Sequence, residues 1–147
     1  MSNPSPSLSV VIPVVERSGG LAQTAAEYFR VLDGLGRSYE VIYVVDSAEQ
    51  EALDYIEKTL SQSENVTCIK LSGSYGDSTA LSTGLDAAKA DELLILPAFS
   101  QIDANEIPKV LDGLQQADFV YAERLRKRDS NFMNHACIQL RLIGKYT

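Results

Sequence analysis

The chain of 147 residues has few cysteines and histidines, and this scarcity argues against several kinds of site. Its two cysteines, Cys68 and Cys137, show neither the spacing of a metal site nor that of a disulfide framework, so we interpret them as reduced thiols. The single histidine, His135, has no Ser, Cys or carboxylate around it in a recognisable catalytic arrangement. These residue types provide no candidate metal ligand and no candidate catalytic residue.

The chain also lacks an apolar run of the roughly 20 residues that cross a membrane. Residues 1–7 are small, polar and proline-containing, with neither the basic start nor the apolar centre of a signal peptide. We therefore expect a cytoplasmic protein without a membrane span, which would reach a membrane only through a partner or a surface helix.

Positive charge is scarce as well: 13 Lys and Arg stand against 20 Asp and Glu, for a net charge of −7. This balance argues against nucleic-acid binding, which depends on clustered cations that neutralise phosphates. The exception is a short basic run made of Arg124, Arg126, Lys127 and Arg128. The run is either a solvated loop or a contact for an anion such as a phosphate.

Short apolar runs, rich in β-branched residues, alternate along the chain with helical patterns. The runs lack the apolar–polar alternation of a half-exposed strand, as is typical of strands buried on both faces of a parallel sheet. We expect five strands, within residues 8–15, 40–45, 66–71, 92–96 and 118–121. Four predicted helices lie between them, with apolar stripes within residues 21–35, 48–60, 77–88 and 105–114. The alternation predicts an α/β fold: a Rossmann-like, mostly parallel sheet with helices on both faces.

The length fits one domain, which we place at residues 7–130. A disordered tail is expected at residues 1–6. Residues 131–147 are expected to form a C-terminal helix or tail, because their apolar residues suit one helical face: Phe132, Met133, Ala136, Leu140 and Ile143.

Ligands of such sheets bind beyond the carboxyl ends of the strands. In this chain those ends are residues 13–17, 46–49, 72–76, 97–101 and 122–129. The second of them offers Asp46 or Ser47 as a cap for the following helix. The third contains Gly73 and Gly76, but Asp77 follows where a phosphate-binding P-loop has lysine, so its expected role is a tight turn into the next helix.

Three blocks of sequence carry a resemblance to a known family: residues 9–14 (SVVIPV), residues 39–46 (YEVIYVVD) and residues 71–88 (LSGSYGDSTALSTGLDAA). In this order and spacing they resemble family 2 glycosyltransferases of the GT-A fold, and within that family the dolichol- and undecaprenyl-phosphate sugar transferases. The resemblance covers about residues 7–130 and implies a domain that binds a nucleotide sugar.

The nucleotide-contacting positions that the resemblance implies are altered here. Pro13 matches the family pattern Pro-x-Tyr-Asn-Glu, but Val15 stands at the tyrosine, Glu16 at the asparagine and Arg17 at the glutamate. Of the family's Asp-Asp pair after the second strand, only the second carboxylate is kept, as Asp46. The resemblance thus implies a nucleotide site that has lost its stacking ring.

The metal motif is altered further. The family's Asp-Ala-Asp-Leu-Gln aligns with residues 97–101 (PAFSQ), so Ala98 and Gln101 are kept while Pro97 and Phe99 replace both metal ligands. Relatives would use Mg²⁺ or Mn²⁺ here, and we expect no such cofactor in this chain. Arg124 matches the family's phosphate-contacting arginine. The candidate nucleotide-sugar-binding residues, all by resemblance, are Pro13, Asp46, Ala98, Gln101 and Arg124.

Three functional hypotheses stay open. The first is a truncated, catalytically inactive or impaired relative of nucleotide-sugar-dependent transferases, with weak nucleotide affinity or a role beside an active transferase. The second is an active, metal-independent glycosyltransferase in which the basic run of residues 124–128 stabilises the leaving diphosphate. The third is a non-enzymatic interaction module or homodimer, which would use an exposed apolar stripe over residues 132–143.

Overall fold

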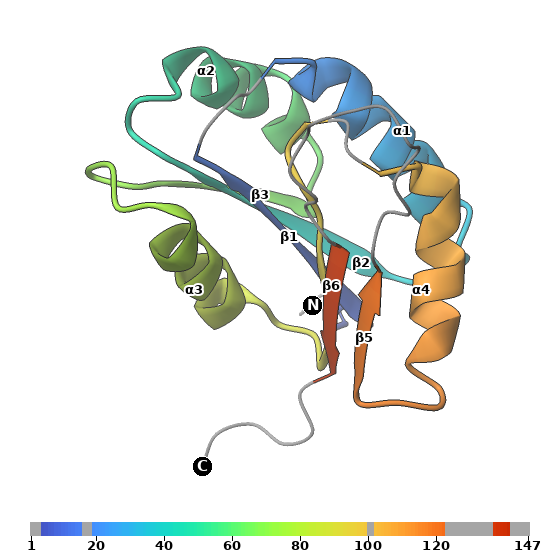
Figure 1. Cartoon of the computed structure of the whole chain (residues 1–147). Helices are drawn as coiled ribbons and strands as arrows, with labels where there is room; N and C mark the ends of the chain where they lie inside the picture. The colour runs from blue at the N-terminus through green and yellow to red at the C-terminus, as the bar shows by residue number, and fades with distance from the viewer. Residues whose placement is uncertain (1–3, 16–18, 100–101, 123–136, 142–147) are drawn as a thin grey trace, which may run out of the picture.

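A twisted, mostly parallel sheet forms the centre of the molecule (Figure 1). In the computed structural model, the described residues 4–15, 19–99, 102–122 and 137–141 contain six strands in the order β3-β2-β1-β4-β6-β5. Neighbours among β3, β2, β1 and β4 are parallel, whereas β6 runs antiparallel to both β4 and β5. The strands are β1 (Leu8–Val14), β2 (Tyr39–Val45), β3 (Val66–Lys70), β4 (Glu92–Ile95), β5 (Phe119–Ala122) and β6 (Cys137–Arg141).

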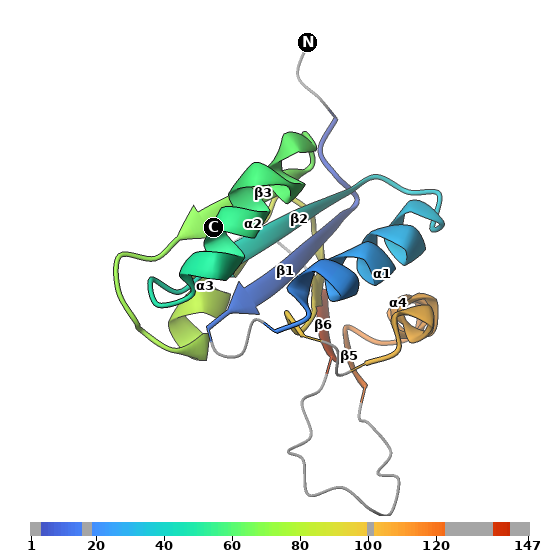
Figure 2. The ribbon, with the colours of Figure 1, turned by 90° about the horizontal axis from the view of Figure 1, so that it is seen from above.

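Helices cover both faces of this sheet, which confirms the predicted α/β class. Figure 1 shows α3 on the opposite side of the sheet from α1 and α2, and Figure 2 shows α4 beyond α1. The α-helices are α1 (Leu21–Asp33), α2 (Gln50–Lys58), α3 (Asp77–Ala87) and α4 (Ile107–Gly113). Two short 3₁₀ turns, η1 (Leu60–Gln62) and η2 (Ala104–Glu106), follow α2 and precede α4.

The pleat of the strands divides their apolar side chains between two core clusters. Alternate residues of β1 and β2, such as Val10 and Tyr43, pack with α1, α2 and α4 in the larger cluster. The intervening residues Ile42 and Val44 pack with Ala80 of α3 in the smaller one. Because successive side chains of a strand point to opposite faces, burial on both faces requires the continuous apolar runs seen in the sequence.

Helix α3 approaches the sheet closely at Gly84. A Cβ atom added there would clash with Cγ1 of Val11 and lie 3.2 Å from Cγ2 of Val44. Both valines stand on central strands and are almost fully buried, so neither has room to move. The glycine therefore sets the distance between α3 and the sheet.

The prediction of a C-terminal helix is wrong for residues 137–141. These residues form strand β6, which lies between β4 and β5. The apolar spacing that suggested a helix is outweighed by backbone pairing, because β6 supplies hydrogen-bonding partners to two strands at once. Ile138, Gln139, Leu140 and Arg141 also alternate between apolar and polar, as strands do. The sheet thus extends past residue 130, and the hypothesis of an exposed apolar helix over residues 132–143 loses its basis in this segment.

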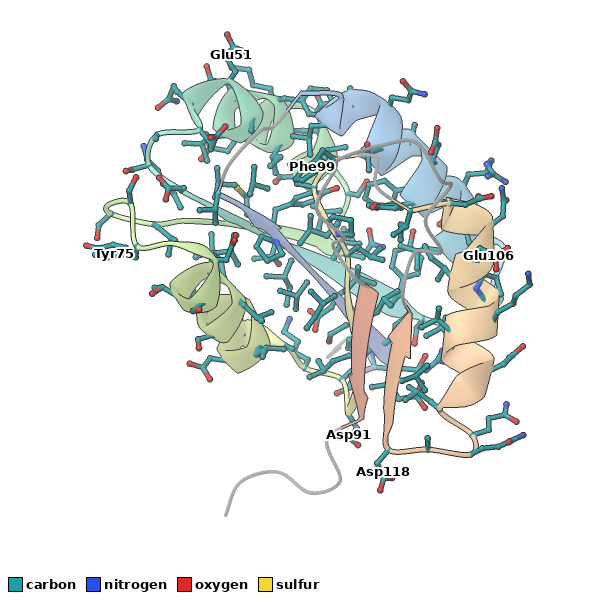
Figure 3. All side chains as sticks on the ribbon, viewed as in Figure 1. Glu51, Tyr75, Asp91, Phe99, Glu106 and Asp118 are labelled. Atoms are coloured by element: carbon teal, nitrogen blue, oxygen red, sulfur yellow. The ribbon has the colours of Figure 1, made fainter. Side chains whose placement is uncertain are left out.

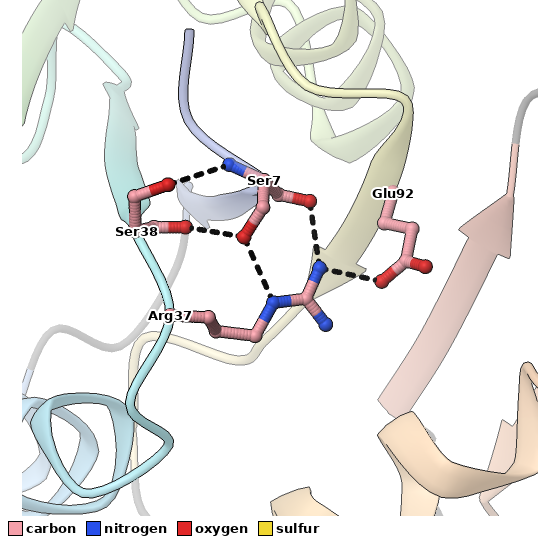
Figure 4. A network of polar contacts seen from close by, with 4 residues as sticks. All are labelled: Ser7, Arg37, Ser38 and Glu92. Carbon is pink, nitrogen blue, oxygen red and sulfur yellow. Dashed lines mark hydrogen bonds and ion pairs between the residues drawn. The ribbon is translucent and has the colours of Figure 1, made fainter. Parts of the chain in front are cut away.

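Polar contacts link the segments at the end of the sheet where β1, β2 and β4 begin (Figure 4). The Arg37 guanidinium donates to Oγ and to the carbonyl oxygen of Ser7, at 2.9 and 2.7 Å, and forms a 2.7 Å ion pair with Glu92. Ser7 in turn donates its hydroxyl to the carbonyl oxygen of Ser38 at 2.8 Å. These bonds join the starts of β1, β2 and β4.

Candidate functional site

The carboxyl ends of the four parallel strands meet at one edge of the sheet, where the sequence predicts the site. Pro13 lies in β1, half-buried, opposite Val44 of β2. The loop that leads from β3 to α3 carries Tyr75, and the segment that follows β4 carries Phe99; Figure 3 labels both. The backbone N–H of Asp46 donates to the carbonyl oxygen of Val14, next to Pro13, and Ser74 bonds the Asp46 side chain, whereas residues 97–99 follow β4 on the other side of β1.

Asp46 is 2% exposed and is held by the protein's own donors. Its Oδ1 atom accepts hydrogen bonds from the backbone N–H of Ala48 at 2.9 Å and from the Ser74 hydroxyl at 2.6 Å. The Ala48 N–H and then the Ser74 hydroxyl lower the pKa of Asp46, and burial opposes them only in part. The carboxylate is therefore ionised at neutral pH and joins the end of β2 to the loop after β3.

The expected capping role of Asp46 or Ser47 is wrong, because α2 begins only at Gln50 and follows Glu49. Asp46 instead stabilises the turn between β2 and α2, where the N–H of Glu49 also bonds the Asp46 carbonyl oxygen at 3.0 Å. Sequence reasoning missed Ser74 as the partner of this carboxylate. No local pattern could have revealed it, since 28 residues separate the two.

After β4, the backbone is anchored to α1. The Tyr28 hydroxyl donates to the carbonyl oxygen of Pro97 at 2.8 Å, and the Tyr28 side chain is 3% exposed. Ala98 turns into the larger core cluster, whereas Pro97 and Phe99 on either side are half-buried. Ala98 thus contributes packing at the base of the site, and the two altered residues flank it.

These residues do not fit a divalent cation. Pro97 and Phe99 offer no side-chain oxygen or nitrogen, and Mg²⁺ or Mn²⁺ needs oxygen ligands. Asp103 is engaged elsewhere, since its Oδ1 caps η2 by accepting from the N–H of Asn105 at 2.9 Å. Within the described residues, no group of three or more His, Cys, Asp or Glu side chains is placed to bind a metal ion.

The remaining candidates lie outside the described residues. These are Gln101, Arg124, the altered positions Glu16 and Arg17, His135, and the basic run of residues 124–128. The predicted phosphate contact of Arg124 and the metal-independent transfer by the basic run therefore stay predictions. Val15, at the position of the family's tyrosine, is half-buried and packs against the smaller core cluster, so it presents no stacking ring.

The comparison with protein families decides the ancestry of this site. The model described as "Glycosyl transferase family 2" matches residues 9–146. The chain belongs to this family. The family domain thus includes β6 as well as the four parallel strands, and the altered positions 97 and 99 lie within the matched region.

Curated relatives support the same assignment. The chain is 27% identical over 131 residues to undecaprenyl-phosphate 4-deoxy-4-formamido-L-arabinose transferase of Edwardsiella ictaluri, covering 88% of this chain and 40% of that protein. It is 26% identical over 143 residues to an uncharacterised glycosyltransferase of Synechocystis, covering 95% and 45%. The chain therefore spans less than half the length of these relatives.

Solved structures share the fold. The mannosyltransferase of Pyrobaculum calidifontis, in complex with GDP-Man and Mn²⁺, superposes with a TM-score of 0.64 at 12% identity, over 84% of this chain and 36% of that one. The 4-diphosphocytidyl-2C-methyl-D-erythritol synthase of Anaerococcus prevotii gives a TM-score of 0.69 at 15% identity, over 92% and 70%. At these identities the likeness concerns the fold alone.

None of the helices among the described residues has the length and apolar character needed to span a membrane.

Proposed function

We propose that this domain is a member of glycosyl transferase family 2 that does not perform metal-dependent glycosyl transfer. A nucleotide sugar, if bound, is held through its nucleoside part and without a divalent cation. The observation that carries the proposal is the pair Pro97 and Phe99, which stand on the segment after β4 where the family resemblance implies two carboxylates.

The chemistry explains why this pair matters. When the bond between sugar and nucleoside diphosphate breaks, negative charge develops on the leaving phosphate and must be stabilised. A divalent cation supplies that stabilisation in a metal-dependent site and needs anionic oxygen ligands to stay in place. Pro97 and Phe99 supply none, and the half-buried Phe99 adds only an apolar ring at this position.

The described carboxylates do not compensate for this loss. Asp46 is directed to Ala48 and Ser74 rather than to the segment after β4. Tyr28 anchors Pro97 through its carbonyl oxygen, which opposes a shift of this segment toward Asp103. Neither Asp46 nor Asp103 is thus directed to the segment after β4 as a substitute ligand.

Donor turnover tests the proposal. The purified protein would be incubated with UDP-glucose or GDP-mannose, with Mn²⁺ in one series and EDTA in the other, and release of UDP or GDP would be measured. We expect no nucleotide release above the protein-free rate in either series. Release that depends on Mn²⁺ and protein concentration would overturn the proposal, because a metal site would then exist despite Pro97 and Phe99.

A further inference from the structure

Strand β3 is the outermost strand on one side of the sheet, and among the described residues it pairs with β2 alone. The open side of such a strand carries a row of unpaired backbone N–H and C=O groups that can bind a further strand. We propose that two copies of this chain pair through β3, antiparallel and about a two-fold axis, so that one sheet continues across both. The proposal goes beyond the proposed function and does not depend on it.

The backbone groups on the open side of β3 can be identified from the bonds to β2. The N–H of Leu71 donates to the carbonyl oxygen of Val45 at 2.9 Å. Because the backbone groups of successive residues in a strand point to opposite sides, Val66, Cys68 and Lys70 direct theirs away from β2. The N–H of Val66 is already used in the turn before β3. A partner strand can therefore bind the N–H groups of Cys68 and Lys70 and the carbonyl oxygens of all three residues.

Two β3 strands satisfy these groups when Cys68 lies opposite the same residue of the second copy. The two Cys68 residues then exchange two hydrogen bonds, and the N–H of each Lys70 donates to the carbonyl oxygen of the Val66 across from it. On the other face of the sheet, Thr67 lies opposite Ile69, and β-branched side chains suit such positions. Because Thr67 is exposed and Ile69 half-buried, the pairing covers surface that a single copy leaves open.

Charge favours a second copy as the partner, in this antiparallel direction. Lys70 is the last residue of β3, whereas Glu64 stands in the turn that leads into the strand, and both residues are exposed. None of the ion pairs among the described residues involves either of them. Antiparallel pairing brings the Lys70 end of each copy to the Glu64 end of the other, so opposite charges meet at both ends of the interface. Parallel pairing would bring like charges together.

The oligomeric state of the full chain tests the proposal, by sedimentation velocity over a range of protein concentrations in a reducing buffer. We expect an equilibrium between monomer and dimer. Lys70→Glu brings two carboxylates together at each end of the interface, and we expect it to weaken dimerisation at least about tenfold. The charge-swapped double variant Lys70→Glu, Glu64→Lys should recover dimerisation to within about threefold of the parent.

The matched control is Lys109→Glu, which makes the same charge change on α4, away from β3. It should alter dimerisation less than about twofold. Thermal unfolding checks that every variant is folded. Rescue by Glu64→Lys also separates a lost contact between copies from a lost fold, since a merely destabilised chain would not be rescued by a second change of charge.

Cross-linking tests the pairing of the two strands directly. In a background with Cys68→Ser and Cys137→Ser, Thr67→Cys places one thiol of each copy diagonally across the pair, about 7 to 8 Å apart. Bismaleimidoethane, a short reagent that joins two thiols, should therefore link two chains of this variant. Ser82→Cys in the same background, on an exposed position of α3, should be linked far less.

A parent that stays monomeric would overturn the inference and leave the open side of β3 to an extended segment of another protein. A Lys70→Glu variant that dimerises as strongly as the parent would also overturn it, because another surface would then hold the dimer. Equal cross-linking of the Thr67→Cys and Ser82→Cys variants would do the same. Mn²⁺-dependent donor turnover, in contrast, would overturn the proposed function and leave the β3 interface standing.

Discussion

The hydroxyl of Tyr28 in α1 donates a hydrogen bond of 2.8 Å to the carbonyl oxygen of Pro97, 69 residues further along the chain. Because Tyr28 is almost fully buried, Tyr28→Phe would leave that partly buried carbonyl oxygen without this donor. We expect the free energy of unfolding to fall by about 1 to 2 kcal/mol. Urea denaturation at neutral pH measures the change.

The matched control is Tyr75→Phe, which removes a hydroxyl at an exposed position. Its free energy of unfolding should stay within about 0.5 kcal/mol of the parent. Equal loss of stability in both variants would show that the Tyr28 hydroxyl has no special part in holding the segment after β4.

Restoring two carboxylates after β4 should cost stability unless a metal ion is supplied. In the double variant Pro97→Asp, Phe99→Asp, two like charges stand on either side of buried Ala98, and the half-buried Phe99 ring is lost. We expect the free energy of unfolding to fall by about 1 to 3 kcal/mol in EDTA, and part of that loss to be recovered in Mn²⁺. Thermal unfolding with and without Mn²⁺ measures both effects.

The control for this variant is Pro97→Ala, Phe99→Leu, which alters the same positions without adding charge. Its unfolding temperature should not respond to Mn²⁺. If the two variants respond alike, the carboxylates do not bind the ion, and the alteration of the metal motif would not support the proposed absence of metal-dependent transfer.

Packing of α3 against the sheet supports a third prediction. Gly84→Ala adds a methyl group against Val11 and Val44. Alanine favours a helix by about 1 kcal/mol over glycine, but overpacking of a tight core costs about 1 to 3 kcal/mol. We expect a net loss of stability in urea denaturation. Ser82→Ala, on the exposed face of the same helix, should be neutral or slightly stabilising, and a stabilising Gly84→Ala would contradict the close approach.

The order of strands and helices up to β5 was predictable because it depends on local patterns. Continuous apolar runs such as the one in β1 are required where a strand is buried on both faces, and the Leu21-to-Leu32 spacing gives one helical face. Strand β6 was not predicted, since its short alternation competes with a helical apolar spacing and is decided by pairing with β4 and β5.

The site was predictable only in part. The family motifs place Asp46 and the residues 97–99 at the carboxyl edge, where the structure has them. The contacts of these residues depend on tertiary packing: Ser74 reaches Asp46 across 28 residues, and Tyr28 reaches Pro97 across 69.

The lowered pKa of Asp46 supports a prediction about acid stability. Hydrogen bonds from Ala48 and Ser74 stabilise the ionised carboxylate in the folded state, whereas the unfolded chain has an ordinary aspartate pKa of about 3.9. The contribution to stability is therefore fully present above about pH 4 and is lost as the pH falls through the lower folded-state pKa. Asp46→Asn removes this contribution at neutral pH. The stability of the variant should therefore fall less than that of the parent as the pH drops below 4.

Urea denaturation between pH 7 and pH 2.5 compares this variant with Asp91→Asn, which removes the same charge from an exposed position. Asp46→Asn should be less stable than the parent at pH 7 and approach it at the acid end, because the parent's own carboxylate is then protonated. Asp91→Asn should follow the parent's pH profile closely. Parallel profiles for the parent and Asp46→Asn would mean that the bonds from Ala48 and Ser74 do not favour the ionised form.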